Sequence, residues 1–154
     1  MGALFWKYLD VVPSVFSARG ELYGLRLLVP RCAALDHLRE TAVLTLDSAT
    51  EAFGGFRIGR ARNDYAYFAS ESEVVAVESA GLAVRRPGSS FPFAWTPPDR
   101  EMLFAVVPRR MPASAMRGGA RVVTRGDLIR DLIGFYGLRV DVVAAIEAKL
   151  GESE

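Results

Sequence analysis

The feature that most constrains the fold is an uninterrupted apolar run, MLFAVV, at residues 102–107. A strand with one face in water would alternate apolar and polar residues, and this segment does not alternate. A continuous apolar run is typical of a strand that is covered on both faces. The segment therefore predicts an interior strand of a β-sheet, with other elements packed on either side of it.

Three other segments have the composition of strands. Residues 21–29 (ELYGLRLLV) have high β-propensity and end before Pro30. A weaker strand is expected over residues 4–12, before Pro13, and a short one over residues 82–84. Together with residues 102–107, these segments predict one small sheet.

One helix is expected over residues 36–53. Asp36 is suited to cap its first turn, and Gly54-Gly55 would end it. A break near residues 46–48 remains open, because Asp47 or Ser48 could cap a second piece. The apolar residues that share one helical face are Leu38, Ala42, Leu46, Ala49 and Phe53.

The next segment predicts a short helix followed by a longer one. Residues 65–69 (YAYFA) are expected to form the short helix after a capping Asp64. Ser70 and Glu73 then have the spacing of a capping box, in which each side chain bonds the other's backbone amide. The helix that follows is expected to end at Gly81.

Two helices are expected in the C-terminal part of the chain. Thr124 and Asp127 repeat the capping pattern and open a helix that Gly137 would end. Asp141 would cap the last helix. One interpretation makes its apolar stripe a docking surface for a protein partner, and the other makes it ordinary packing onto the domain's own core. The stripe consists of Val142, Val143, Ile146 and Leu150.

The order of these elements indicates the fold class. Residues 85–100, with four prolines, and residues 108–120 are expected to be loops. Strands, helices, a strand and further helices predict an α/β (α+β) fold, with a small mixed β-sheet packed with several helices. A chain of 154 residues without a repeat or a linker predicts a single domain over residues 1–154.

Arginine dominates the positive charge, although the formal net charge is only +1. Seventeen of the nineteen basic residues are arginine. Residues 102–126 contain five arginines and no acid, and residues 54–63 contain three more. Such local basic segments can bind a polyanion even when the net charge is near zero. The absence of glutamine fits a thermophilic origin, and GC-rich coding is an equal explanation for the arginines.

The sequence offers little for catalysis. Cys32 and His37 are the only cysteine and histidine, so an internal disulfide and a zinc site are both excluded. The segment GGFRIG lacks the lysine and hydroxyl of a phosphate-binding loop. We expect a protein that is not an enzyme and needs no cofactor or metal. Without a membrane-length apolar run or a signal peptide, a cytoplasmic location is expected.

The segment GGFRIGRAR, residues 54–62, is the main candidate for binding. Its glycines allow close approach of the backbone, and its arginines could form two-point contacts with phosphates. A glycine-rich turn with solvated arginines is the alternative interpretation. The arginines expected to hold the phosphates of a single-stranded RNA end are Arg57, Arg60, Arg62, Arg85 and Arg86.

Three segments follow one another in the order seen in one family: residues 36–63, 64–82 and 127–150. They contain His37-Leu38 at a helix start, Ala61-Arg62-Asn63, a helix closing on Gly81 and the turn Tyr136-Gly137. Over residues 33–150 the chain thus resembles the family of tRNA-binding regulatory subunits of the KEOPS complex, which includes the PRPK-binding protein.

The resemblance implies a non-catalytic subunit that supports threonylcarbamoyladenosine modification of tRNA. Its implied partners are the kinase-like ATPase subunit of KEOPS, bound through helices, and the single-stranded 3′ CCA end of tRNA. An accessory or structural subunit of another archaeal nucleic-acid machine, such as a primase or an RNA-processing assembly, would share the same sequence signals. The identity of a copurifying partner distinguishes the two.

Overall fold

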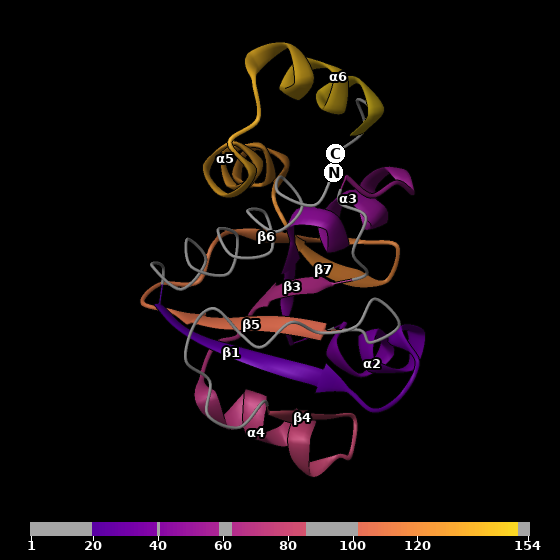
Figure 1. Ribbon diagram of the computed structural model, residues 1–154, viewed down its shortest axis with the longest axis vertical. Helices are drawn as coiled ribbons and strands as arrows, with labels where there is room; N and C mark the ends of the chain where they lie inside the picture. The colour runs from indigo at the N-terminus through magenta and orange to yellow at the C-terminus, as the bar shows by residue number, and fades with distance from the viewer. Residues whose placement is uncertain (1–19, 40, 59–62, 86–101, 151–154) are drawn as a thin grey trace, which may run out of the picture.

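A seven-stranded mixed sheet runs through the computed structural model, which describes residues 20–39, 41–58, 63–85 and 102–150 (Figure 1). The strand order is β4-β1-β5-β3-β2-β7-β6. Five helices in the described residues pack around this sheet. The α/β fold class predicted from the sequence is therefore confirmed, although the sheet is larger than expected. The strands are β1 (Gly20–Leu27), β2 (Val43–Thr45), β3 (Asp64–Tyr67), β4 (Ala83–Arg85), β5 (Met102–Pro108), β6 (Ser114–Arg117) and β7 (Ala120–Val123).

Strand β5 lies inside the sheet, as its apolar sequence predicts. It pairs antiparallel with β1, opposing Leu25 to Leu103, and parallel with β3, opposing Tyr65 to Phe104. Its first five residues are buried. The rings of Tyr65 and Phe104 stack with their centroids 5.6 Å apart. Burial of both faces explains why the segment has no polar alternation.

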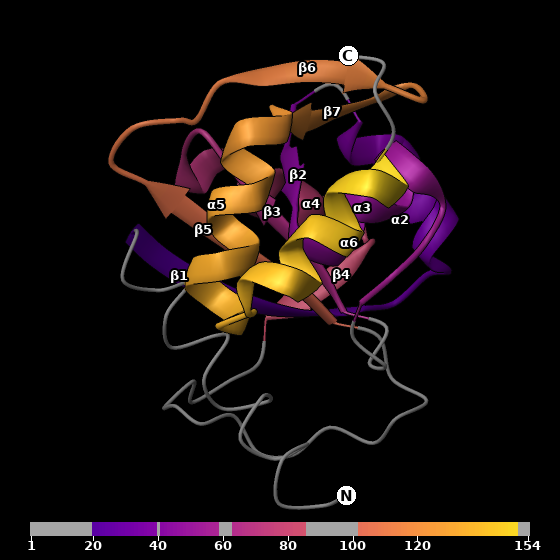
Figure 2. The ribbon, with the colours of Figure 1, turned by 90° about the horizontal axis from the view of Figure 1, so that it is seen from above.

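The helices lie at both ends and on the faces of the sheet. Figure 2 shows α5 and α6 side by side in front of the strands, and these two helices contact each other and α3. Figure 1 places α4 and β4 at the end of the molecule opposite α6. The helices are α2 (Arg31–Leu38), α3 (Leu46–Gly54), α4 (Glu71–Ser79), α5 (Arg125–Tyr136) and α6 (Val140–Leu150).

The helix expected over residues 36–53 does not form as one piece, whereas the alternative of a break near residues 46–48 agrees with the start of α3 at Leu46. Helix α2 ends at Leu38, and β2 then runs between β3 and β7 before α3 begins at Leu46. All three residues of β2 are buried. Leu46 joins strand to helix with a φ of 53°, a left-handed conformation that is uncommon for leucine. The apolar residues of this segment have helical spacing, but residues 43–45 form a strand because they pair with β3 and β7.

The short helix expected over residues 65–69 is also wrong, because most of it belongs to β3. Every residue of β3 is buried, and the strand is hydrogen-bonded to β2 and β5. Tyrosine has high β-propensity and fits such a strand.

The loop expected over residues 108–120 contains a β-hairpin. Strands β6 and β7 pair antiparallel and oppose Arg117 to Ala120 across Gly118 and Gly119. Both glycines have positive φ values, 56° and 81°, as a two-residue hairpin turn requires. A Gly-Gly pair between possible strands is a hairpin signal that could have predicted this turn.

The predicted helix ends are confirmed, whereas the reciprocal capping bonds are not formed. Gly81 and Gly137 have φ values of 78° and 63° after α4 and α5. Ser70 contacts the hydroxyl of Ser72 instead of a backbone amide, and Thr124 donates to the carboxylate of Asp127. The strand expected over residues 4–12 lies outside the described residues, as do residues 86–101 of the proline-rich loop.

Candidate nucleic-acid interface

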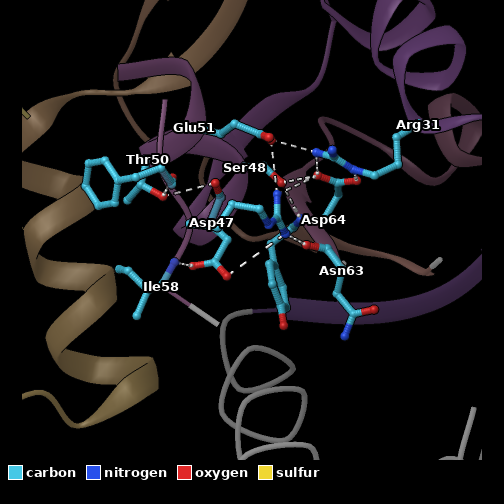
Figure 3. A network of polar contacts seen from close by, with 11 residues as sticks. Arg31, Asp47, Ser48, Thr50, Glu51, Ile58, Asn63 and Asp64 are labelled. Atoms are coloured by element: carbon cyan, nitrogen blue, oxygen red, sulfur yellow. Dashed lines mark hydrogen bonds and ion pairs between the residues drawn. The ribbon is translucent and has the colours of Figure 1, made fainter. Parts of the chain in front are cut away.

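A buried polar network lies where β3 begins and α3 packs against it (Figure 3). Asp64, at the start of β3, accepts two hydrogen bonds of 2.8 Å from the guanidinium of Arg31 and one of 2.6 Å from Ser48 Oγ. Arg31 also donates to Glu51 at 2.7 Å. Asp64 is 1% exposed, so hydrogen bonds from its partners must replace the contacts with water that the carboxylate has lost.

Arg57 belongs to the same network. It donates to Glu51 at 3.1 Å and to the backbone carbonyl of Asn63, and one of its nitrogens lies 3.8 Å from Asp64 Oδ1. Its side chain is 16% exposed. The positive charge of Arg57 thus compensates internal carboxylates, which disfavours its expected role in holding phosphates.

The network joins four parts of the chain. Hydrogen bonds to Asp64 are the largest influence on Arg31 and raise the pKa of its guanidinium above the ordinary value, against the opposing effect of burial. Asp47, on the first turn of α3, accepts a hydrogen bond from the backbone amide of Ile58. Helices α2 and α3, strand β3 and the segment after α3 are therefore held together by charge.

Arg85 is engaged by acids at the other side of the sheet. It donates to Glu78 at 2.9 Å and to Glu71 at 3.4 Å, and its guanidinium lies 4.6 Å from the ring centroid of Tyr23. Burial acts to lower the pKa of Arg85, but the hydrogen bonds and charges of Glu78 and Glu71 together outweigh it, and the pKa is raised. Strands β1 and β5 separate β4 from β3, so the structure does not bring Arg85 and Arg57 together. Arg60, Arg62 and Arg86 lie outside the described residues.

The pKa of Tyr23, whose ring contacts Arg85, provides a test of the contacts around Arg85. Burial, followed by the hydrogen bond to Glu21, raises the pKa of Tyr23 from 10.0 to about 12. Above pH 10 the phenol ionises in the unfolded chain but keeps its proton in the folded one. Its contribution to stability should therefore be lost as the pH rises from 10 through 12. The phenolate absorbance of the wild type minus that of Tyr23→Phe should show a midpoint near 12; a midpoint near 10 would contradict the assignment.

Six further arginines lie at the end of α2, in the loop after β5, in the β6–β7 hairpin and at the start of α5. The acid-free stretch noted in the sequence forms the whole of β5, the β6–β7 hairpin and the start of α5. Arg109 and Arg110 are exposed, and the backbone amide of Arg121 donates to the carbonyl of the exposed Arg39 at the end of α2. In the described part of the chain, Arg109, Arg110 and Arg121 form no ion pair. The six arginines of this basic end are Arg39, Arg109, Arg110, Arg117, Arg121 and Arg125.

The two ends of the sheet therefore differ in charge. Strand β4 and helix α4 carry Glu71, Glu73 and Glu78, whose charges are only partly offset by Arg85. Arg117 and Arg121 of the basic end lie on β6 and β7, at the opposite edge of the strand order. On charge alone, we expect an extended anion to be attracted more to the β7–β6 end than to the α4 end.

The apolar stripe of α6 packs mainly onto the protein itself. Val143 and Ile146 are each 7% exposed and Leu150 is 4% exposed, and the last two belong to the main hydrophobic core. Val142 is 41% exposed and faces away from this core. The structure thus gives three of the four expected docking residues a place in the protein's own interior, which favours the packing interpretation.

Cys32 and His37 do not form a reactive pair on a shared helical face. Both lie on α2 and are exposed. Residues five apart on a helix point about 140° away from each other. Among the described residues, no group of three histidine, cysteine or carboxylate side chains is placed to hold a metal ion.

The sequence matches no protein-family model, and neither a curated protein nor a solved structure matches the chain. None of the helices in the described segments has the length and apolar character needed to cross a membrane.

Proposed function

We propose that the protein is a non-catalytic RNA-binding subunit that holds the phosphate backbone at the basic end of its sheet. The observation that carries this proposal is the presence of five arginines in a stretch of 25 residues without an acid, Met102–Gly126, which includes the β6–β7 hairpin at one edge of the sheet. Arginine suits phosphate because its planar guanidinium presents several donors in a fixed geometry. The two arginines held by internal acids, Arg57 and Arg85, have no part in this contact.

Salt dependence tests the phosphate contacts directly. RNA binding releases counterions, so the affinity for a single-stranded RNA should fall with salt with a log-log slope of about 0.7 per phosphate contact. Replacing Arg109 and Arg110 with alanine should weaken binding and make the slope shallower by roughly 1.4. Fluorescence anisotropy of a labelled 20-nucleotide RNA over a series of salt concentrations measures both quantities.

A matched control removes the same charge elsewhere. Arg130 and Arg139 are 76% and 80% exposed and are paired with Asp127 and Asp141. Their double alanine variant should keep nearly the wild-type slope. Equal losses in the two double variants would show that only net charge matters, and failure of the wild type to bind RNA would overturn the proposal.

The KEOPS resemblance makes a more specific proposal, in which the RNA is the 3′ CCA end of tRNA and the protein partner is a kinase-like ATPase. Comparing intact tRNA with tRNA lacking CCA tests the first part, because a general backbone contact hardly distinguishes the two. Copurification from native extract tests the second: a kinase-like ATPase supports KEOPS, whereas a polymerase or a nuclease supports another nucleic-acid machine.

A further inference from the structure

Three cations lie over aromatic rings in the described structure. Arg117 lies 4.7 Å from the ring centroid of Phe53, Lys149 lies 5.3 Å from that of Phe56, and the third pair joins Arg85 to Tyr23. The first two pairs share the C-terminal end of α3 and bring in residues from the hairpin and from α6. They therefore place two aromatic rings beside the basic end of the sheet.

Tight packing fixes this arrangement. Gly54, the last residue of α3, would place a Cβ only 2.8 Å from the ring of Phe56 and 2.9 Å from the carbonyl oxygen of Lys149. The absence of a side chain at Gly54 thus lets the ring and the end of α6 come close. Phe53 and Phe56 pack against the core but keep part of their surface exposed.

An ordered guanidinium beside an aromatic ring is suited to an unpaired base. Bases that are not paired stack on aromatic rings and on the flat faces of arginine, and this contact does not need a particular base. Arg121 stands in the same hairpin but lies opposite Met116, so its side chain points to the other face of the hairpin from Arg117. A base-paired duplex keeps its bases stacked on one another and so offers no free base face to an aromatic ring.

We propose that the Arg117–Phe53 pair, with Phe56 and Lys149 beside it, is a stacking subsite for an unpaired base of a single-stranded nucleic acid. This inference rests on the proposed function, since the phosphates that flank the base are bound by the basic end. It adds discrimination between single and double strands, which phosphate contacts alone do not supply.

The chemically similar pair of Arg85 and Tyr23 provides an internal control. Its surroundings include Glu21, Glu71 and Glu78, all within reach of the ring or the guanidinium. Their negative charge repels a phosphate backbone, so an aromatic ring at this position makes no contact with nucleic acid. Tyr23→Leu therefore removes an aromatic ring without removing the subsite.

The experiment compares a labelled 12-nucleotide oligoadenylate with an RNA duplex of 12 base pairs. Arg117→Lys keeps the positive charge but removes the flat guanidinium, and Phe53→Leu removes the ring that orders it. Each change should lower the affinity for the single strand by about tenfold and leave the affinity for the duplex within about twofold. Tyr23→Leu should bind both as the wild type does.

The possible results distinguish a failure of the stacking subsite from a failure of the proposed function. If the wild type binds neither RNA, the proposed function and the subsite both fail. A different result is that the wild type binds both RNAs while each variant loses affinity for the single strand and the duplex equally, or for neither. In that case the proposed phosphate contacts at the basic end are supported and the stacking subsite is contradicted. Arg117 lies on a hairpin that is partly exposed, so Arg117→Lys reports on the subsite even if Phe53→Leu fails to fold.

Discussion

Replacing Asp64 with alanine is expected to lower the free energy of unfolding by about 3–5 kcal/mol, because it leaves buried charge without its partner. Asp64 accepts two hydrogen bonds from Arg31 and lies beside Arg57, and both arginines are largely shielded from water. Ser48 would lose its acceptor as well. Urea unfolding followed by circular dichroism measures the change through the transition midpoint.

The control for Asp64 is Asp141→Ala. Asp141 is 65% exposed and pairs with Arg139, whose hydrogen bond lowers the pKa of that carboxyl. Water screens this pair, so the unfolding midpoint should barely move. A small effect at Asp64 as well would show that the network of Figure 3 contributes little to stability.

Replacing Ile146 with aspartate is expected to unfold the protein rather than to remove one binding partner selectively. Ile146 is 7% exposed in the main core, and a carboxylate there would have to be buried without a partner or protonated. The loss of its apolar contacts alone costs about 2–5 kcal/mol. Thermal unfolding of the purified variant tests this, with the loss of the cooperative transition as the expected result.

Val142→Asp is the matched variant on the same helix. Val142 is 41% exposed, so a charge at this position can remain in water. The variant should fold with a melting temperature close to that of the wild type. If Ile146→Asp folded normally and lost a protein partner, the docking interpretation of the α6 stripe would be supported against our expectation.

The parts of the fold that the sequence predicts are those determined by local pattern. Strand β5 follows from a continuous apolar run, and helix α5 from apolar periodicity between Thr124 and Gly137. The errors concern Val43–Thr45 and Asp64–Tyr67, which are too short for a period to be measured. Their conformation is determined by strands that lie far away in the sequence, β7 and β5.

The candidate site was predictable to a similar extent. The stretch without acids is visible in the sequence, and it forms the basic end of the sheet. The expected roles of Arg57 and Arg85 are not supported, because the fold brings carboxylates to them. Asp64 and Glu71 reach these arginines only after the strands and helices have packed. A charge count along the chain cannot show such neutralisation.

The strand order also has a kinetic consequence. Leu25 lies opposite Leu103 and Leu44 opposite Val122, so two of the central pairings join residues about eighty positions apart in the sequence. Closing such long loops lowers the entropy of the chain before the stabilising contacts form. Sheets with many such distant pairings fold in milliseconds to seconds. During synthesis, β1 and β2 leave the ribosome long before β5 and β7 exist. The nascent chain can pair β1 with β4 and β2 with β3, but the other edge of β1 and of β2 must stay unpaired until the C-terminal half has been made.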